Sequence, residues 1–340
     1  MTNSEKTRLI NVLEGKPVDR VPVICPGGMM NMAVREVMTA TGRTWPRAHL
    51  DPKDMAMLSL GVKHLGGIEN VGVPFCMTVE AEALGAGVFI GTESTEPRVV
   101  EYPLKRVKEW ENLPSITEDH YRVSIVLEAI RILKEKCPET PVIGNITGPI
   151  SLATSLIEPM DFYRALRRKP DIALRFLDFV TDNLIFFARA MLKAGADIIN
   201  IADPSGTGEI LGPWAFSKVA VPYINKITDA VEASSGYAMV HICGRLGSVL
   251  GELGKLKSPV ISIDALTGLR KVKESLPEKV IMGNVSTFLL EKGTPEKVAI
   301  AAATSIKQGA GILAPACGIS PRTPLKNIRA MVRAAKGERD

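Results

Sequence analysis

The stretch PDIALRFLDFVTDNLIFFARAMLKAGADIINIADPS, residues 170–205, joins two kinds of pattern. Apolar residues recur at helical spacing through 170–196, and a short β-branched run, DIINIADPS, follows at 197–205. This change of period predicts an amphipathic helix that is followed by a buried strand. The same unit recurs along the chain, and its repetition decides the fold class.

Eight short apolar runs read as strands, and segments with helical spacing separate them. The runs are VPVICP at 21–26, IENVGVPFCMTV at 68–79, PVIGNITGP at 141–149, DIINIADPS at 197–205, AMVHICG at 238–244, VISIDA at 260–265, VIMGNVS at 280–286 and GILAPACG at 311–318. Helical spacing is clearest at 121–136, 170–196 and 294–311. Eight β/α alternations predict an α/β fold, a TIM (β/α)8 barrel, as one domain over residues 1–340.

Two segments lie outside this alternation. Residues 1–20 predict a helix that precedes the barrel, and residues 81–120 predict an excursion of short strands. A doubly wound open sheet also alternates strands and helices, and it is the alternative fold. No glycine-rich G-x-G-x-x-G motif follows the first run, which weakens the dinucleotide-binding version of that alternative.

Composition narrows the classes of protein. The chain is 46% hydrophobic and 23% charged, as in a soluble globular protein with a large core. No apolar run is long enough to span a membrane, and the charged N-terminus lacks the apolar core of a signal peptide. Five cysteines at irregular spacing argue against a disulfide framework. We therefore expect a cytoplasmic protein.

The net charge of +5 is modest and allows small anionic substrates without selecting one. The densest basic cluster, RALRRKPDIALR at 164–175, alternates with apolar positions and predicts a solvated helix face. Only 5% of residues are aromatic, so little is available for stacking on bases, and we expect no nucleic-acid partner.

Polar side chains recur where the predicted strands end. In a TIM barrel the functional residues lie at the C-terminal ends of the strands and in the loops that follow. In this chain those positions hold Glu80, Asn145, Asp203, His241, Cys243, Asp264, Asn284 and Cys317. These residues are therefore the candidates for a site at the barrel mouth.

His241, Cys243 and Cys317 predict a zinc site. Strand side chains alternate with a period of two, so His241 and Cys243 share one side of their strand. Cys317 lies at the polar end of another apolar run. Three protein ligands leave the fourth position of zinc open for a substrate, as in catalytic sites. The alternative is a core histidine with two buried cysteines.

Several stretches together resemble the uroporphyrinogen decarboxylase superfamily, and more narrowly its methylcobalamin:coenzyme M methyltransferase branch. They are TRLINVLEGKPVDRVPV, VPFCMTVEAEALGA, NIADPSGTGEILGPWAF, HICG and PACGIS, and they span nearly the whole chain. The resemblance implies a TIM barrel. It also implies that His241, Cys243 and Cys317 bind zinc, because this His-x-Cys…Cys motif separates the methyltransferases from the decarboxylases.

The resemblance also suggests roles for other residues. Asp203 occupies the place of the decarboxylases' catalytic aspartate, and Glu80 lies two positions from Glu82 as strand neighbours would; both are candidate catalytic residues. Each carboxylate has a structural alternative, because Asp203 could cap a helix and Glu80 could bind backbone amides.

Three further residues are candidate substrate-binding residues. Asn145 is a pocket donor or a turn former, and Asp264 is a displaceable fourth zinc ligand or the cap of a helix that begins near Gly268. Met29, with Met30 and Met32, could pack on a corrinoid face or fill the core.

The expected reaction is methyl transfer from a methylated corrinoid to a thiol, most simply coenzyme M. Zinc holds a thiol as the nucleophilic thiolate, and attack on the methyl group gives a thioether and Co(I). We find no Asp-x-His-x-x-Gly carrier motif, so a separate corrinoid protein is the expected transient partner.

Three alternatives stay open. The first is a methyltransferase that demethylates a methylated compound and charges the corrinoid, and the second is a non-catalytic zinc-dependent binding protein. The third, uroporphyrinogen decarboxylation, is disfavoured because the segment after the first strand, ICPGGMMNMAVREV, holds only Arg35, whereas the decarboxylases carry several arginines there for substrate carboxylates.

Overall fold

The computed structural model describes residues 3–31 and 33–338. Its main sheet is parallel, with strand order β1-β4-β5-β6-β7-β8. These strands are β1 (Val71–Val73), β4 (Val142–Thr147), β5 (Ile198–Ala202), β6 (Tyr237–Ile242), β7 (Val260–Ile263) and β8 (Val280–Met282). Nearly all their residues are buried, because crossover helices cover the outer side of a parallel sheet.

Two further segments close this sheet into a barrel. Ile312 pairs in parallel with Met282 at the end of β8, and Leu313 pairs in parallel with Val23. The amide of Glu69, just before β1, then donates to the carbonyl oxygen of Val23 at 3.0 Å. The runs predicted at 21–26 and 311–318 thus take the two remaining strand positions of the barrel, although each forms isolated bridges rather than a regular strand. We call them the first and the last stave. The TIM barrel is confirmed, and the open sheet is excluded.

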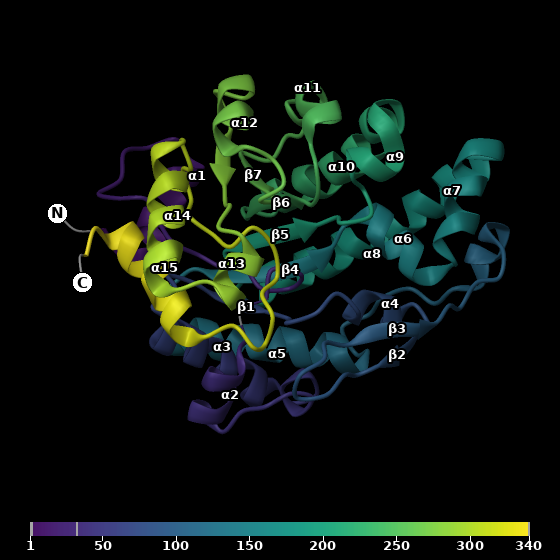
Figure 1. The fold of residues 1–340 in the computed structure, drawn as a ribbon. Helices are drawn as coiled ribbons and strands as arrows, with labels where there is room; N and C mark the ends of the chain where they lie inside the picture. The colour runs from purple at the N-terminus through teal and green to yellow at the C-terminus, as the bar shows by residue number, and fades with distance from the viewer. Residues whose placement is uncertain (1–2, 32, 339–340) are drawn as a thin grey trace.

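Helices surround the barrel (Figure 1). They are α1 (Glu5–Leu13), α2 (Arg35–Thr41), α3 (Pro52–Gly66), α4 (Val79–Ala83), α5 (Tyr121–Lys136), α6 (Pro149–Leu156), α7 (Pro159–Arg168), α8 (Pro170–Ala194), α9 (Gly208–Ala215), α10 (Val221–Glu232), α11 (Leu250–Leu253), α12 (Leu269–Ser275), α13 (Thr287–Lys292), α14 (Pro295–Lys307) and α15 (Leu325–Lys336). Among the described residues, no helix is long and apolar enough to cross a membrane.

The predicted helices agree closely with the observed ones where the ends carry clear signals. The segment predicted at 170–196 is α8, which begins at Pro170 and ends before Gly195, whose φ of 117° suits glycine. The segment predicted at 294–311 is α14, whose N-cap Thr294 accepts a hydrogen bond from the amide of Lys297. The helix predicted over 1–20 is shorter, since α1 covers only Glu5–Leu13.

Two local predictions were wrong. The run at 68–79 is a strand only over Val71–Val73, and Glu80 and Glu82 lie on the short helix α4 rather than on a strand. The basic cluster at 164–175 is not one helix face, because α7 ends at Arg168 and α8 begins at Pro170. Proline at the first position of a helix favours a new start, and the residue before it is disfavoured in helical conformation.

The excursion predicted at 81–120 contains an antiparallel hairpin. It pairs β2 (Gly87–Phe89) with β3 (Arg98–Glu101), and a 3-10 turn at Val107–Asn112 follows. Figure 1 shows this hairpin and α7 at one end of the molecule and α15 at the other. The loops after the strands lie at the hairpin end, which is therefore the mouth of the barrel.

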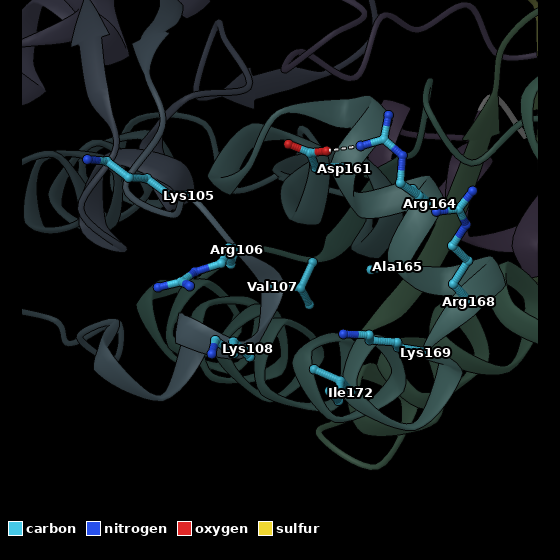
Figure 2. A pocket seen from close by; sticks show the side chains of 10 residues that line it. All are labelled: Lys105, Arg106, Val107, Lys108, Asp161, Arg164, Ala165, Arg168, Lys169 and Ile172. Atoms are coloured by element: carbon cyan, nitrogen blue, oxygen red, sulfur yellow. Dashed lines mark hydrogen bonds and ion pairs between the residues drawn. The ribbon is translucent and has the colours of Figure 1, made fainter.

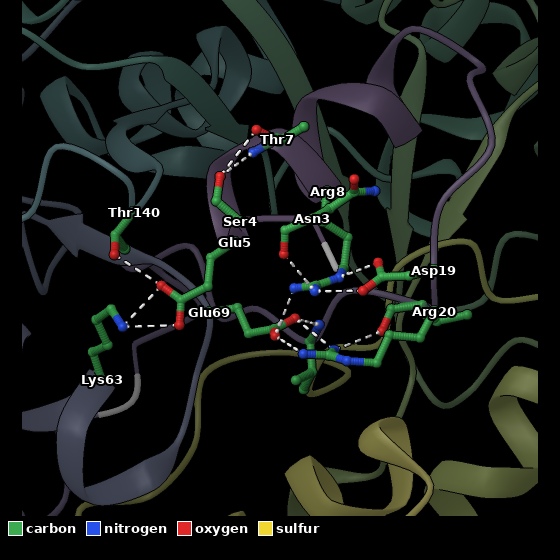
Figure 3. A network of polar contacts seen from close by, with 12 residues as sticks. Asn3, Ser4, Glu5, Thr7, Arg8, Asp19, Arg20, Lys63, Glu69 and Thr140 are labelled. Atoms are coloured by element: carbon green, nitrogen blue, oxygen red, sulfur yellow. Dashed lines mark hydrogen bonds and ion pairs between the residues drawn. The ribbon is translucent and has the colours of Figure 1, made fainter. Parts of the chain in front are cut away.

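A buried ion network ties the N-terminal segment to the opposite, closed end (Figure 3). The carboxylate of Glu69 accepts hydrogen bonds from Arg8, from Arg20 and from the amide of Val23. The Arg8 and Glu69 side chains are only 5% and 3% exposed, and Arg8 also pairs with Asp19. Glu69 thus holds α1 and the first stave against β1.

Replacing Glu69 with Gln is expected to lower the free energy of unfolding by about 3 kcal/mol, because it removes the buried carboxylate that pairs with both Arg8 and Arg20. Urea unfolding at neutral pH measures this change. Glu128→Gln is the matched control: its pair with Arg131 is about half exposed on both sides, and its loss should cost less than about 0.5 kcal/mol. Equal effects of the two substitutions would contradict the role of Glu69.

Candidate functional site

The structure brings His241, Cys243 and Cys317 together at the barrel mouth. Nε2 of His241 lies 3.0 Å from Sγ of Cys243, and that sulfur lies 3.7 Å from Sγ of Cys317. The three ligand atoms all lie within 4.8 Å of one another. His241 is in β6, Cys243 follows that strand directly, and Cys317 follows the last stave. Cys243 and Cys317, which are 74 positions apart in sequence, thus share one cluster because the barrel closes.

The donor atoms suit a tetrahedral metal ion. Zinc–sulfur bonds of about 2.3 Å and zinc–nitrogen bonds of about 2.0 Å place two sulfurs about 3.8 Å apart and sulfur and nitrogen about 3.5 Å apart. The observed sulfur–sulfur distance of 3.7 Å agrees, and the nitrogen–sulfur distance of 3.0 Å is about 0.5 Å shorter than a bound zinc ion requires. One imidazole and two thiols are also the donor types that zinc prefers.

Ser262 orients the imidazole. Its Oγ lies 2.9 Å from Nδ1 of His241 and donates to Sδ of Met30 at 3.6 Å. The hydroxyl that donates to Met30 can accept a hydrogen bond from Nδ1–H, which leaves the lone pair on Nε2 free for a metal. Ser262 is directly opposite His241 in the register of β6 and β7. The sequence analysis missed this residue, because the register between two strands is not visible in either strand alone.

The two thiols share a proton unequally. The hydrogen bond with Cys243 lowers the pKa of Cys317 to about 5. The same bond raises the pKa of Cys243, and burial raises it further. Cys317 is therefore the more readily ionised of the two thiols, and a thiolate there favours binding of a cation.

The loop that carries Met29 and Met30, which we call the methionine loop, lies against the cluster. Sδ of Met29 lies 3.8 Å from Sγ of Cys243, and Met30 is fully buried beneath it. The backbone of this loop packs directly on the loop that carries Cys317: a Cβ at Gly318 would lie 2.1 Å from the carbonyl oxygen of Met29. Met29 thus borders the candidate site, and Met30 is core. Met32 lies outside the described residues.

Asn145 lies inside the barrel and uses its amide for structure. Its Nδ2 donates to the carbonyl oxygens of Pro26 and Val73, and its Oδ1 accepts from Asn200 on the neighbouring strand. Gly27 has a φ of 108°, and a Cβ there would lie 2.6 Å from Nδ2 of Asn145. Asn145 therefore anchors the start of the methionine loop. Among the described residues, its side-chain NH2 group already donates to backbone carbonyl oxygens.

Asp203 is fully buried and bonded to the N-terminus of α6. Its carboxylate accepts from the amides of Ile150 and Ser151 and from the Ser151 hydroxyl, at 3.2, 2.8 and 2.6 Å. Burial raises the pKa of Asp203, and these hydrogen bonds oppose that shift. The helix that Asp203 caps is α6, which precedes it in sequence.

Glu80 is also buried and engaged. Its carboxylate accepts from the amide of Thr147 at 2.7 Å and contacts the Thr147 hydroxyl at 3.3 Å. Burial raises the pKa of Glu80 to about 7. Glu80 therefore fastens α4 to the end of β4 and holds a titratable carboxyl near neutral pH.

Asp264 lies beside the cluster but forms a turn of its own. Its Oδ1 accepts from the amide of Leu266 at 2.9 Å, and its Oδ2 faces the amide of Gly244 at 3.5 Å. It does not cap α12, whose N-cap is Gly268 without a side-chain hydrogen bond. The negative charge of Asp264 contributes to the raised pKa of Cys243, which places it within electrostatic reach.

Glu96 was missed by the sequence analysis. It follows the tip of the β2–β3 hairpin and accepts a weak hydrogen bond, 3.4 Å, from the buried amide of Asn31. Burial raises the pKa of Glu96 to about 7, and Cys317 contributes to that shift. The sequence did not point to Glu96, because this residue lies in the β2–β3 hairpin rather than at the end of a barrel strand.

Comparisons with known proteins agree with this geometry. The sequence model of the family described as uroporphyrinogen decarboxylase (URO-D) matches residues 4–337. The chain is 35% identical to the methylcobamide:CoM methyltransferase MtaA of Methanosarcina barkeri, over 97% of this chain and 96% of that protein. It is 36% identical to the methylcobamide:CoM methyltransferase MtbA of Methanosarcina acetivorans, over 97% of each. A solved methyltransferase structure from Methanosarcina mazei, 33% identical, superposes with a TM-score of 0.92 over 98% of this chain and 99% of that one.

The raised pKa of Glu80 predicts a pH-dependent stability difference. The folded chain keeps a proton on Glu80 up to about pH 7, whereas the unfolded chain loses it near 4.5. The stabilising contribution is therefore complete below about pH 4.5 and is lost as the pH rises through about 7. The difference in free energy of unfolding between Glu80→Gln and the unsubstituted protein should therefore change with pH. As the pH rises from about 5 to 8, it should shift by about 2 kcal/mol in favour of the variant. Urea unfolding across this range tests it, with exposed Glu135→Gln as control; a constant difference would contradict the assignment.

Proposed function

This chain belongs to the uroporphyrinogen decarboxylase family, and from that premise we propose that it is an enzyme that transfers a methyl group from a methylated corrinoid to a small thiol. The single observation that carries the proposal is the cluster of His241, Cys243 and Cys317 at the barrel mouth. Coenzyme M is the proposed thiol, because the relatives MtaA and MtbA are named for it.

His241, Cys243 and Cys317 are the proposed ligands of a zinc ion. Two thiolates and a neutral imidazole balance the charge of Zn²⁺ and leave one of four positions for a substrate. When bound there, zinc would lower the pKa of an incoming thiol so that its sulfur is a thiolate at neutral pH. Asp264 lies next to Cys243, and we propose it as a fourth ligand that an incoming thiol displaces from the open position.

The side chains around the cluster have supporting roles in this proposal. Ser262 fixes the tautomer of His241, and Met29 offers an apolar thioether beside Cys243 for the approach of a corrinoid. Asp203 and Glu80, proposed as catalytic residues from the resemblance, act as positioning residues, since their carboxylates hold α6 and α4.

The reaction balances without a further reagent. The thiol sulfur forms the new S–CH3 bond and releases its proton, and the cobalt–carbon bond breaks. Its electron pair stays on the metal, so Co(III) becomes Co(I). We propose that the corrinoid arrives on a separate protein.

Uroporphyrinogen decarboxylation fits the site less well. Its substrate carries several carboxylates, which arginine side chains would clamp. The loop after the first stave places Met29 beside the thiol of Cys243 instead.

The proposed function is tested by absorbance spectroscopy of free methylcobalamin with zinc-loaded protein under anaerobic conditions. Addition of coenzyme M should convert the methyl–cobalt spectrum to that of Co(I). Cys317→Ala should abolish this conversion and bound zinc together, whereas Cys137→Ala, at the end of α5 and away from the cluster, should change neither. Conversion by a zinc-free Cys317→Ala protein would refute the proposal. Absence of conversion in the unsubstituted zinc protein would point to the corrinoid-charging direction or another thiol.

Ser262→Ala is expected to weaken zinc binding about 10–100-fold, because His241 loses the partner that fixes its orientation. Competition with a chromophoric chelator measures this affinity. Ser258→Ala is the matched control, since Ser258 is buried just before the start of the same strand. Its hydroxyl bonds to the carbonyl oxygens of Ala238 and Val260 and accepts from the amide of Val260. Equal zinc affinities of the two variants would contradict the role of Ser262.

A further inference from the structure

A strongly basic cavity of about 520 Å³ lies between the segment after β3 and the start of α7 and α8. Figure 2 shows its charged side chains around Val107 and Ala165, which occupy the middle. We call its cations the basic rim: Lys105, Arg106, Lys108, Arg164, Arg168 and Lys169. An apolar centre inside a charged border is the usual anatomy of a protein–protein interface.

The basic rim holds most of the excess positive charge of the molecule. It contains six of the 42 basic residues, and Asp161 is the one acidic residue in the lining, of 37 in the chain. With Glu109, which pairs with Arg106, counted beside Asp161, six cations and two carboxylates give this region a net charge of +4, against +5 for the whole chain. A positive field this concentrated steers an oppositely charged partner toward one face.

Most of the basic rim lacks an internal counter-charge. Arg164 pairs with Asp161, and Arg106 pairs with Glu109. Within residues 3–31 and 33–338, Lys105, Lys108, Arg168 and Lys169 have no carboxylate partner at ion-pair distance, and all four are exposed. Four cations held close together repel one another, so an external anionic surface would relieve that repulsion.

The basic rim borders the mouth that contains the thiol cluster. Leu104 pairs in parallel with Ile157, which joins the rim segment to the start of α7. The hydroxyl of Tyr163, on α7, donates to the carbonyl oxygen of Ser205 in the loop after β5. That loop begins at Asp203, whose amide donates to the carbonyl oxygen of His241. These contacts connect the basic rim to the loop that lies beside His241.

We propose that the basic rim is the docking surface for an acidic patch on the protein that carries the methylated corrinoid. The assignment rests on the proposed function, since only a protein-borne corrinoid needs such a surface. A protein partner fits better than a nucleic acid, because the lining has no aromatic side chain on which a base could stack. Rim charges of this kind set the rate of association and its salt dependence more than the chemical step.

The test compares two methyl donors, free methylcobalamin and the methylated corrinoid protein purified from the same organism. The variant is Lys105→Glu/Arg168→Glu, and the control is Lys136→Glu/Lys307→Glu, which makes the same change in charge at exposed positions where α5 and α14 end. At low ionic strength the rim variant should raise KM for the corrinoid protein at least tenfold and leave kcat unchanged. The control should change neither value, and neither protein should differ with free methylcobalamin.

Each outcome decides a separate point. Equal KM values for the rim variant and the control, with the corrinoid protein as donor, would overturn the docking surface while leaving methyl transfer intact. Failure of the unsubstituted enzyme with both donors would refute the proposed function and, with it, the docking surface. Binding of a fluorescent 20-nucleotide RNA near physiological salt, lost only in the rim variant, would reassign the surface to nucleic acid.

Discussion

The closure of the barrel is the constraint on which the candidate site depends. His241 and Cys243 share one side of a strand end because strand side chains alternate. Cys317 joins them only because the last stave pairs with both β8 and the first stave, through Ile312 with Met282 and Leu313 with Val23. The 3.7 Å between the two sulfurs is thus a product of the whole fold.

The buried polar groups Asp203, Glu80 and Asn145 form hydrogen bonds that hold the helices and loops around the cluster in place. Asp203 caps α6, Glu80 secures the end of β4, and Asn145 anchors the loop that carries Met29. Each is buried and bonded, as buried polar groups must be. In the proposed function the reactive groups are consequently the two thiols and the imidazole, and the carboxylates keep the surrounding loops in place.

The sequence predicted the barrel and the three-residue cluster because both leave local signals. Helix–strand units recur with clear caps and prolines, and His-x-Cys reports the side-chain direction of one strand. Ser262 and Glu96 left no such signal: the first depends on the register between β6 and β7, and the second on how a hairpin folds back over the mouth. The break between α7 and α8 at Pro170 was also misread, and that break shapes the basic cavity.

The central claim is that His241, Cys243 and Cys317 hold one zinc ion with a position open to the substrate thiol. X-ray absorption at the zinc edge tests it most directly, in the protein alone and with coenzyme M. The account predicts two sulfur ligands in the first sample and three in the second, with one zinc per chain. An unchanged sulfur count on addition of the thiol, or zinc retained when Cys317 is replaced by Ala, would contradict it.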